Sequence, residues 1–348
     1  MEGFIMCTIE NAYENVMRHT RSKFACYDVV SDCIDPRSGE KLINPEDESY
    51  ARFTAFRNNE IDYDADTSLE ACVIYKKVFG NIINRLDEKE IRLQPDPENR
   101  YNRYGLKYEL GEPDCTGGLS FRGDTMNSVA TTNRVYFWEH KELHNERKME
   151  GFPWPKEALD LIELYHTPGN FMVLPYREGL SINAARGTGN THDYFDLYLL
   201  AIYNFFLEQN GQEKEGKISL GYVLGLNTKL ELFMKYYLLP FIEDDQCRFY
   251  TSGRQFMDDI EDCNDLISNV VPGWESFVEE NLFHDFVGRN AYGHFGKPNE
   301  LWDGHFAIPD AGYGKPYTEE QFMQFYTRTA EAIKKRSDRI YDRLHGVV

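Results

Sequence analysis

Apolar residues recur at helical spacing over much of the chain, and this pattern predicts a mainly α protein. From Tyr194 to Leu207 apolar side chains surround almost the whole helix, so we expect this helix at the centre of the core. Thr318-x-x-Gln321 fits a capping box, which predicts that the last helix begins there and runs to about Leu344. The same spacing predicts further helices at 69–85, 155–165, 228–239, 254–268 and 273–287.

The predicted β component is minor. The Tyr-rich segment 100–110 and the apolar run 171–174 favour strands, whereas 290–315 is rich in Gly and Pro and favours a loop. Residues 1–118 have an irregular pattern, and we expect them to pack on a mainly helical core region, 119–348. The fold class is therefore mainly α with a minor β component (α+β) in the N-terminal half, in a single large globular domain.

The amino-acid composition disfavours several functional classes for this protein. The chain has 348 residues and a net charge of −20, so general binding to nucleic acid, which needs Lys and Arg against phosphates, is disfavoured. No apolar run approaches the ~20 residues of a membrane span, and the first residues do not resemble a secretory signal. The seven cysteines include no C-x-x-C. We expect a cytoplasmic protein with free thiols and no membrane partner; its oligomeric state is left open.

The segment 122–134 is the first candidate site. Gly123 followed by Asp124 or Thr125 predicts the capped start of a helix that ends near residue 146. A helix entrance favours anions through its free N–H groups. Asn127, Thr131 and Arg134 are three or four residues apart and share one helix face. The alternative is that Asp124 is only a cap and that the other side chains are solvated.

Two further segments carry polar residues beside glycine. His166 and Asn170 belong to a turn before the apolar run, where His166 is either an acid or base, or a residue that only hydrogen-bonds the turn. Arg186 opens a glycine-rich loop that ends at Asp193, and this loop is a candidate cradle for phosphate or carboxylate. The simpler interpretation of Asp193 is that it complements the dipole of the following helix.

We therefore predict one polar pocket for a small anionic or nucleotide-like ligand, formed by 122–134, 166–170 and 186–196. His166 and Asp124 are its candidate catalytic residues. Its candidate ligand-binding residues are Arg122, Asn127, Thr131, Arg134, Asn170, Arg186 and Asp193. No cofactor is indicated, and no metal motif is complete. Whether the protein is an enzyme is left open.

Four blocks resemble an uncharacterised bacterial family of unknown function. They are Gly123-Asp-Thr-Met-Asn-Ser128, His166-Thr-x-Gly-Asn-Phe171, Asp193-Tyr-Phe-Asp-Leu197 and Trp302-Asp-Gly-His305. The resemblance implies a bacterial, intracellular protein in which these blocks are functional or architectural landmarks.

A fifth segment, Arg289-Asn-x-x-x-His294, is similar to the motif of HEPN ribonucleases. That resemblance implies metal-independent RNA cleavage by Arg289 and His294, as in toxins and phage-defence effectors, with the motif on a helix. Gly293 and the residues after His294 favour a loop instead. A third hypothesis is a non-catalytic interaction module whose acidic surface binds a basic partner or mimics nucleic acid.

Overall fold

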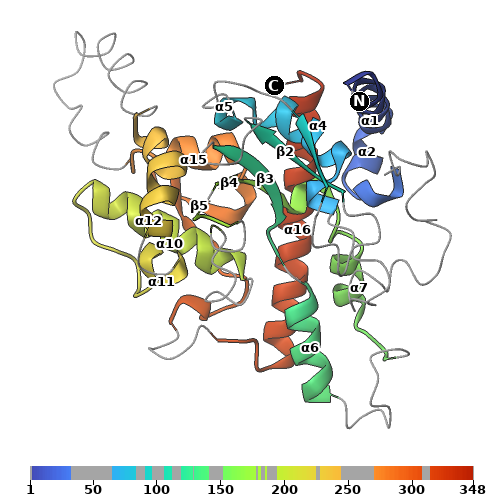
Figure 1. Cartoon of the computed structure of the whole chain (residues 1–348). Coiled ribbons are helices and arrows are strands. Elements are labelled where there is room, and N and C mark those ends of the chain that lie inside the picture. Colours follow the sequence, from blue (N-terminus) through green and yellow to red (C-terminus); the bar gives the residue numbers. More distant parts are fainter. Residues whose placement is uncertain are drawn as a thin grey trace. The chain divides into compact units, whose positions relative to one another are not determined.

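A computed structural model (Figure 1) describes most of the chain. The described residues are 2–32, 65–83, 91–95, 106–111, 119–127, 129–140, 152–177, 179–181, 185, 194–224, 228–243, 270–307 and 314–347. They are mainly helical with small antiparallel sheets, which confirms the predicted fold class. None of the described helices has both the length and the apolar character needed to cross a membrane.

The chain divides into two compact units. The first comprises Met1–Val173, Leu301–Asp303 and Gly314–Val348, and the second comprises Leu174–Glu300 and Gly304–Tyr313. The first unit thus takes residues from both regions distinguished in the sequence, 1–118 and 119–348.

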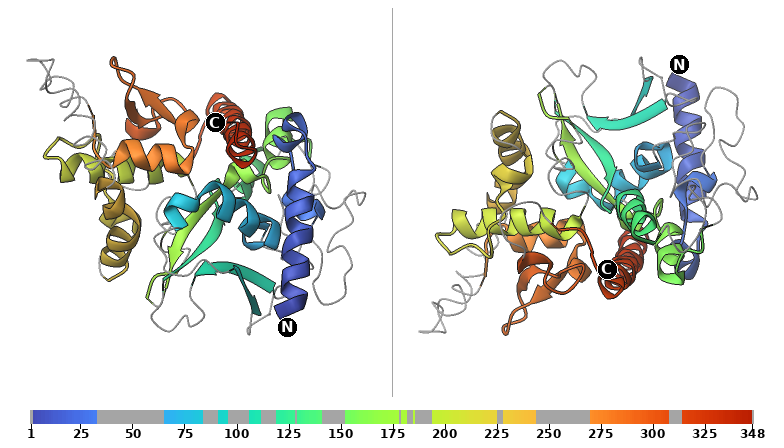
Figure 2. Two further views of the ribbon diagram at one scale, coloured as in Figure 1. Left: turned by 90° about the horizontal axis from the view of Figure 1, so that it is seen from above. Right: turned by 90° about the horizontal axis from the view of Figure 1, so that it is seen from below.

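The first unit is organised around one long helix, α16 (Glu319–Leu344). Both halves of the predicted capping box are present, because the Thr318 side chain accepts from the Gln321 N–H and the Gln321 side chain accepts from the Thr318 N–H. In both views of Figure 2, α16 (red) lies beside α7. The other helices of this unit are α1 (Glu2–Met17), α2 (Arg21–Phe24), α4 (Leu69–Val78), α5 (Gly80–Ile83), α6 (Val129–His140) and α7 (Lys156–Ile162), with the short turns η1 (Val29–Asp32), η2 (Ala65–Thr67) and η4 (Pro168–Asn170).

A four-stranded sheet has the order β1-β2-β3-β4. Its strands are β1 (Ile91–Pro95), β2 (Leu106–Gly111), β3 (Ser120–Thr125) and β4 (Phe171–Tyr176). β2 and β3 pair in antiparallel register, with Leu110 opposite Phe121. The prediction that Asp124 or Thr125 caps a helix is therefore wrong, because both residues belong to β3 and the helix α6 begins only at Val129.

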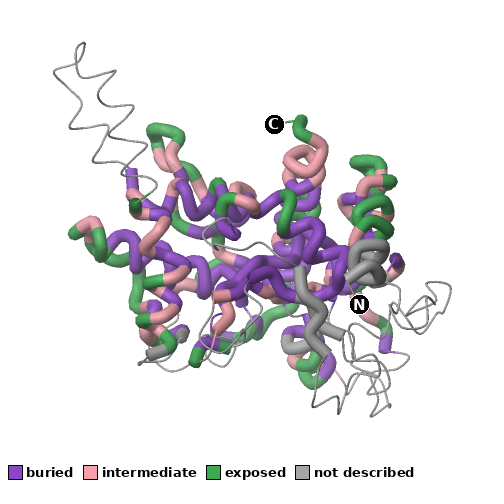
Figure 3. Tube along the Cα trace, turned by 45° about the horizontal axis from the view of Figure 1, so that its top comes forward, coloured by how far each residue is buried: buried purple, intermediate pink, exposed green. Residues whose placement is uncertain are grey.

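The second unit is built on α10 (Phe195–Gln209), which is buried at every position from Phe195 to Leu207, as predicted. Its buried Asn204 is hydrogen-bonded to the backbone of Glu215 and Ile218. Figure 3 shows such buried segments in purple. The remaining elements are α11 (Leu220–Leu224), α12 (Thr228–Phe233), the π-helical turn η5 (Met234–Leu238), α15 (Trp274–Asn281), η6 (His284–Phe286), β5 (Val287–Arg289), β6 (Phe295–Pro298) and η7 (His305–Ala307).

Two predictions for this unit need correction. The helix expected over 273–287 ends at Asn281, because Leu282 adopts a left-handed conformation with φ of 58°. The stretch expected to be a loop from residue 290 contains β6, which pairs with β5 in a two-stranded sheet outside the N-terminal half. The helix predicted over 254–268 lies outside the described residues.

Candidate functional site

Two of the three predicted segments meet inside the first unit. The Asn127 N–H donates to the Asn170 side-chain oxygen at 3.1 Å, and the Asn170 side-chain amide donates to the Asn127 carbonyl at 3.3 Å. The Met126 N–H donates to the Asn170 carbonyl at 2.7 Å. Asn127 and Asn170 are fully buried. The two asparagines thus join the end of β3 to η4, which is an architectural role.

The glycines of these two segments are required by close packing. A β-carbon at Gly123 would lie 1.9 Å from the Asp66 carbonyl oxygen, and one at Gly169 would lie 2.2 Å from the Ile333 carbonyl oxygen. The buried Arg336 side chain of α16 donates to the carbonyl of Gly169 at 2.9 Å. The first two blocks of the family resemblance are therefore packing landmarks of this unit.

The basic residues predicted to hold an anion in the first unit are placed differently. The Arg122 Nε donates to the Glu109 carboxylate at 2.9 Å in a largely buried ion pair, which neutralises its charge. Arg134 is exposed on α6. The Thr131 side chain, Arg186 and Asp193 lie outside what the structure describes. The predicted pocket therefore has no described arginine with the expected geometry.

The contacts of the two candidate catalytic residues, Asp124 and His166, are those of residues that stabilise the fold. Asp124 lies in β3, and its carboxylate accepts the Thr125 N–H at 2.9 Å. His166 is nearly buried, its carbonyl accepts the Val29 N–H at 3.1 Å, and its Nδ1 is 3.9 Å from the Asp28 carboxylate. That distance is too long for a hydrogen bond that would orient the imidazole.

A fully buried carboxylate–histidine pair with hydrogen-bond geometry lies in the second unit. His305 Nδ1 is 2.6 Å from the Asp196 carboxylate, and both side chains are buried. The Glu300 carboxylate accepts the N–H groups of Gly304 and Phe306 at 3.0 and 2.8 Å, so it fixes the backbone on either side of His305. The Tyr194 ring meets the imidazole edge-to-face at 5.3 Å.

This pair joins the third and fourth blocks of the family resemblance, as Asn127 and Asn170 join the first two. A carboxylate on one imidazole nitrogen fixes the orientation of the ring. Because the side chains of His305 and Asp196 are buried, the role that we assign to the pair is to hold η7 against α10. Asp196 and His305 belong to separate sequence blocks, and no local pattern links the two residues across 109 positions.

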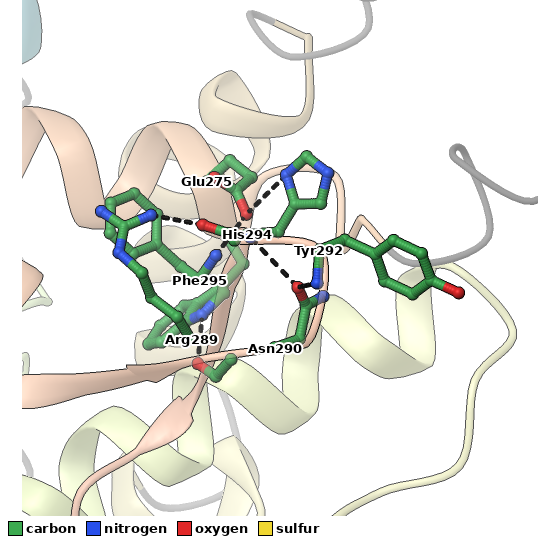
Figure 4. A network of polar contacts seen from close by, with 9 residues as sticks. Glu275, Arg289, Asn290, Tyr292, His294 and Phe295 are labelled. Carbon is green, nitrogen blue, oxygen red and sulfur yellow. Dashed lines mark hydrogen bonds and ion pairs between the residues drawn. The ribbon is translucent and has the colours of Figure 1, made fainter.

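The segment similar to the HEPN motif forms the turn between β5 and β6 (Figure 4). The Asn290 side-chain oxygen accepts the N–H groups of Tyr292 and His294, each at 3.0 Å. The Asn290 N–H in turn donates to the His294 carbonyl at 2.9 Å. Asn290 is therefore explained by the turn itself, as asparagines in such turns commonly are.

Arg289 and His294 point to opposite sides of this turn in Figure 4. The Arg289 guanidinium donates to the Gly293 carbonyl and lies 4.4 Å from the centre of the Phe295 ring. His294 Nδ1 faces the Glu275 carboxylate at 3.7 Å. The helix that the HEPN resemblance implies is absent from residues 287–298, so the ribonuclease hypothesis loses its structural basis.

A cationic cluster in the second unit was not anticipated from the sequence. Arg177, just after β4, lies with its guanidinium carbon 4.7 Å from the centre of the Tyr236 ring. The Lys235 Nζ lies 5.1 Å from the same centre. We refer to Arg177, Lys235 and Tyr236 as the Arg177 cluster. Lys235 is exposed and the other two side chains are partly exposed, so solvent reaches the cluster.

The Tyr236 phenol is acidified by this arrangement. Partial desolvation raises its pKa, but the hydrogen bonds and positive charges of Arg177 and Lys235 together lower it by more, so the pKa of Tyr236 lies below the ordinary value of 10.0. The Tyr236 ring thus has two cationic side chains beside it in a chain of net charge −20.

No group of three or more His, Cys, Asp or Glu among the described residues is arranged to hold a metal ion. Comparisons with protein-family models, curated proteins and solved structures gave no match.

Proposed function

We propose that this protein binds a small anionic ligand, such as a phosphate ester or a dicarboxylate, at the Arg177 cluster. The ligand class is the one expected from the sequence, whereas the site is a different one. The observation that supports the proposal is the convergence of the Arg177 guanidinium and the Lys235 ammonium on one partly exposed phenol. A cytoplasmic location belongs to the same proposal.

The chemistry of the three groups suits an oxyanion. A guanidinium offers paired N–H donors that match phosphate and carboxylate oxygens, and an ammonium adds a compact positive charge. Lys235 is exposed, and its Nζ lies beside the Tyr236 ring. A protonated Tyr236 adds an O–H donor.

Thermal unfolding of the full chain with inorganic phosphate, AMP or citrate tests the proposal. A ligand that binds only the folded state stabilises it by about 2.7 kcal/mol at a hundred times its Kd. We expect at least one of these anions to raise the Tm of the protein. Because salt by itself screens surface charges, sodium chloride is added so that every sample has the same ionic strength.

The variants Arg177→Gln and Lys235→Gln should each weaken this stabilisation, because each removes one positive charge from the site. Lys229→Gln is the matched control, since Lys229 is exposed on the adjoining helix α12 and is not part of the cluster. No stabilisation by any of the three anions, or equal stabilisation of all variants, would contradict the proposal. The first of these results would favour the acidic interaction module.

A further inference from the structure

Tyr236 lies in a wider helical turn than its neighbours. Residues Met234–Leu238 form a π-helical turn between α12 and the α-helical residues that follow. Such turns are rare and are found frequently at functional sites. Tyr237 and Leu238 are buried in this turn, whereas Lys235 is exposed and Tyr236, whose ring lies against Arg177, is partly exposed.

We propose that Tyr236 is a nucleophile, and that its substrates are phosphate esters held by Arg177 and Lys235. The choice of substrate rests on the proposed function, whereas the reactivity of the phenol does not. Three geometric observations support the inference: the two cations on one ring, the partial exposure of that ring, and the π-helical turn. A tyrosine oxygen attacks as phenolate, and adjacent cations increase the fraction of phenolate at a given pH.

The step balances with the groups present. The phenol proton passes to solvent, and the Tyr236 oxygen forms a new bond to phosphorus. The bond from phosphorus to the ester oxygen breaks, and its electron pair stays on the departing oxygen. The Lys235 ammonium supplies the proton that an alkoxide leaving group takes up. Arg177 faces the non-bridging oxygens, where negative charge is concentrated in phosphoryl transfer.

The reactivity is tested with a neutral arylsulfonyl fluoride, which modifies phenolates and does not require an anion site. The full chain carries its own controls, because Tyr222, Tyr292 and Tyr317 are 45%, 59% and 76% exposed. We expect modification of Tyr236, mapped by mass spectrometry, to be at least several-fold faster than that of these three more exposed tyrosines. Equal or slower modification of Tyr236 would overturn the inference.

The source of the reactivity is tested with Arg177→Gln and Lys235→Gln. Each should slow the modification of Tyr236, whereas Lys229→Gln should leave its rate unchanged. Unchanged rates in both cluster variants would overturn the role of the cations. Phosphate should protect Tyr236 from the reagent. If Tyr236 is modified fast and phosphate does not slow the reaction, the result would support Tyr236 as a nucleophile and contradict the proposed anion site. The experiment therefore distinguishes a failure of one proposal from a failure of the other.

The substrate class is tested with bis(p-nitrophenyl) phosphate, an activated phosphodiester anion. We expect release of p-nitrophenolate together with a covalent phosphoryl adduct on Tyr236, and loss of both in Tyr236→Phe. This variant keeps the ring against the two cations, so it should remain folded, which circular dichroism checks. Release that is the same in Tyr236→Phe, or no adduct on Tyr236, would overturn phosphate esters as the substrate class.

Discussion

The buried Asp196–His305 pair should stabilise the protein far more than an exposed pair of the same length. Its N···O distance is 2.6 Å, and the two side chains are 1% and 0% exposed. In Asp196→Ala the imidazole stays buried without its carboxylate, and losses of this kind are about 3–5 kcal/mol. Asp196→Asn keeps an oxygen that accepts a hydrogen bond from Nδ1, so its loss should be smaller, about 1–2 kcal/mol.

The chain contains a matched control. Arg328 and Asp303 are also 2.6 Å apart, but their side chains are 40% and 73% exposed. The charge and hydrogen bond of Arg328 lower the pKa of Asp303, yet water screens the pair. We therefore expect Asp303→Ala to leave the free energy of unfolding almost unchanged.

Urea unfolding at pH 7, followed by tryptophan fluorescence, measures both effects. The buried Trp274 reports on the second unit, which contains the Asp196–His305 pair, and the buried Trp302 reports on the first unit, which contains Arg328 and Asp303. A double variant Asp196→Ala/His305→Ala should cost less than the sum of the two single variants, because the residues are in contact. Equal losses for Asp196→Ala and Asp303→Ala, or additive losses in the double variant, would refute the assignment of the stability to burial of the pair.

Three further predictions concern other parts of the chain. Gly169→Ala should lower the free energy of unfolding by about 1–3 kcal/mol, because its β-carbon meets a carbonyl and a hydroxyl of α16, whereas Gly80→Ala, in an open helical position, should not; equal urea midpoints would contradict this. Burial raises the pKa of the Cys72 thiol, so iodoacetamide should alkylate the exposed Cys26 first, and the reverse order would show that Cys72 is accessible. In a spectrophotometric titration, the difference between the wild-type chain and Tyr236→Phe should show one phenol ionising below pH 10. Because its folded pKa is the lower one, its contribution to stability is present above the unfolded value and is lost as pH falls through the folded value, and a difference midpoint at or above 10 would contradict it.

Elements set by local interactions were predictable from the sequence. The capping box of Thr318 and Gln321 lies within a single turn, and the structure contains both of its hydrogen bonds. The apolar run after Tyr194 specifies burial on every side of α10, whatever packs against it. In both cases the residues that decide the structure are neighbours in the sequence.

Elements set by distant partners were not predictable in the same way. Gly123 and Asp124 have the composition of a helix entrance, but the pairing of Phe121 with Leu110 extends the chain into β3. The contact of Asp196 with His305 spans 109 residues and has no local signal. Arg177 and Tyr236 are separated in the sequence by α10, α11 and α12, and no pattern in the sequence marks the π-helical turn.

The most direct test of the proposed anion site is isothermal titration of inorganic phosphate into the full chain and into Arg177→Gln/Lys235→Gln at constant ionic strength. We expect saturable binding with one site per chain in the wild-type protein, and binding at least tenfold weaker in the double variant. Phosphate binding of equal affinity in the two proteins, or no binding to the wild-type protein, would contradict it.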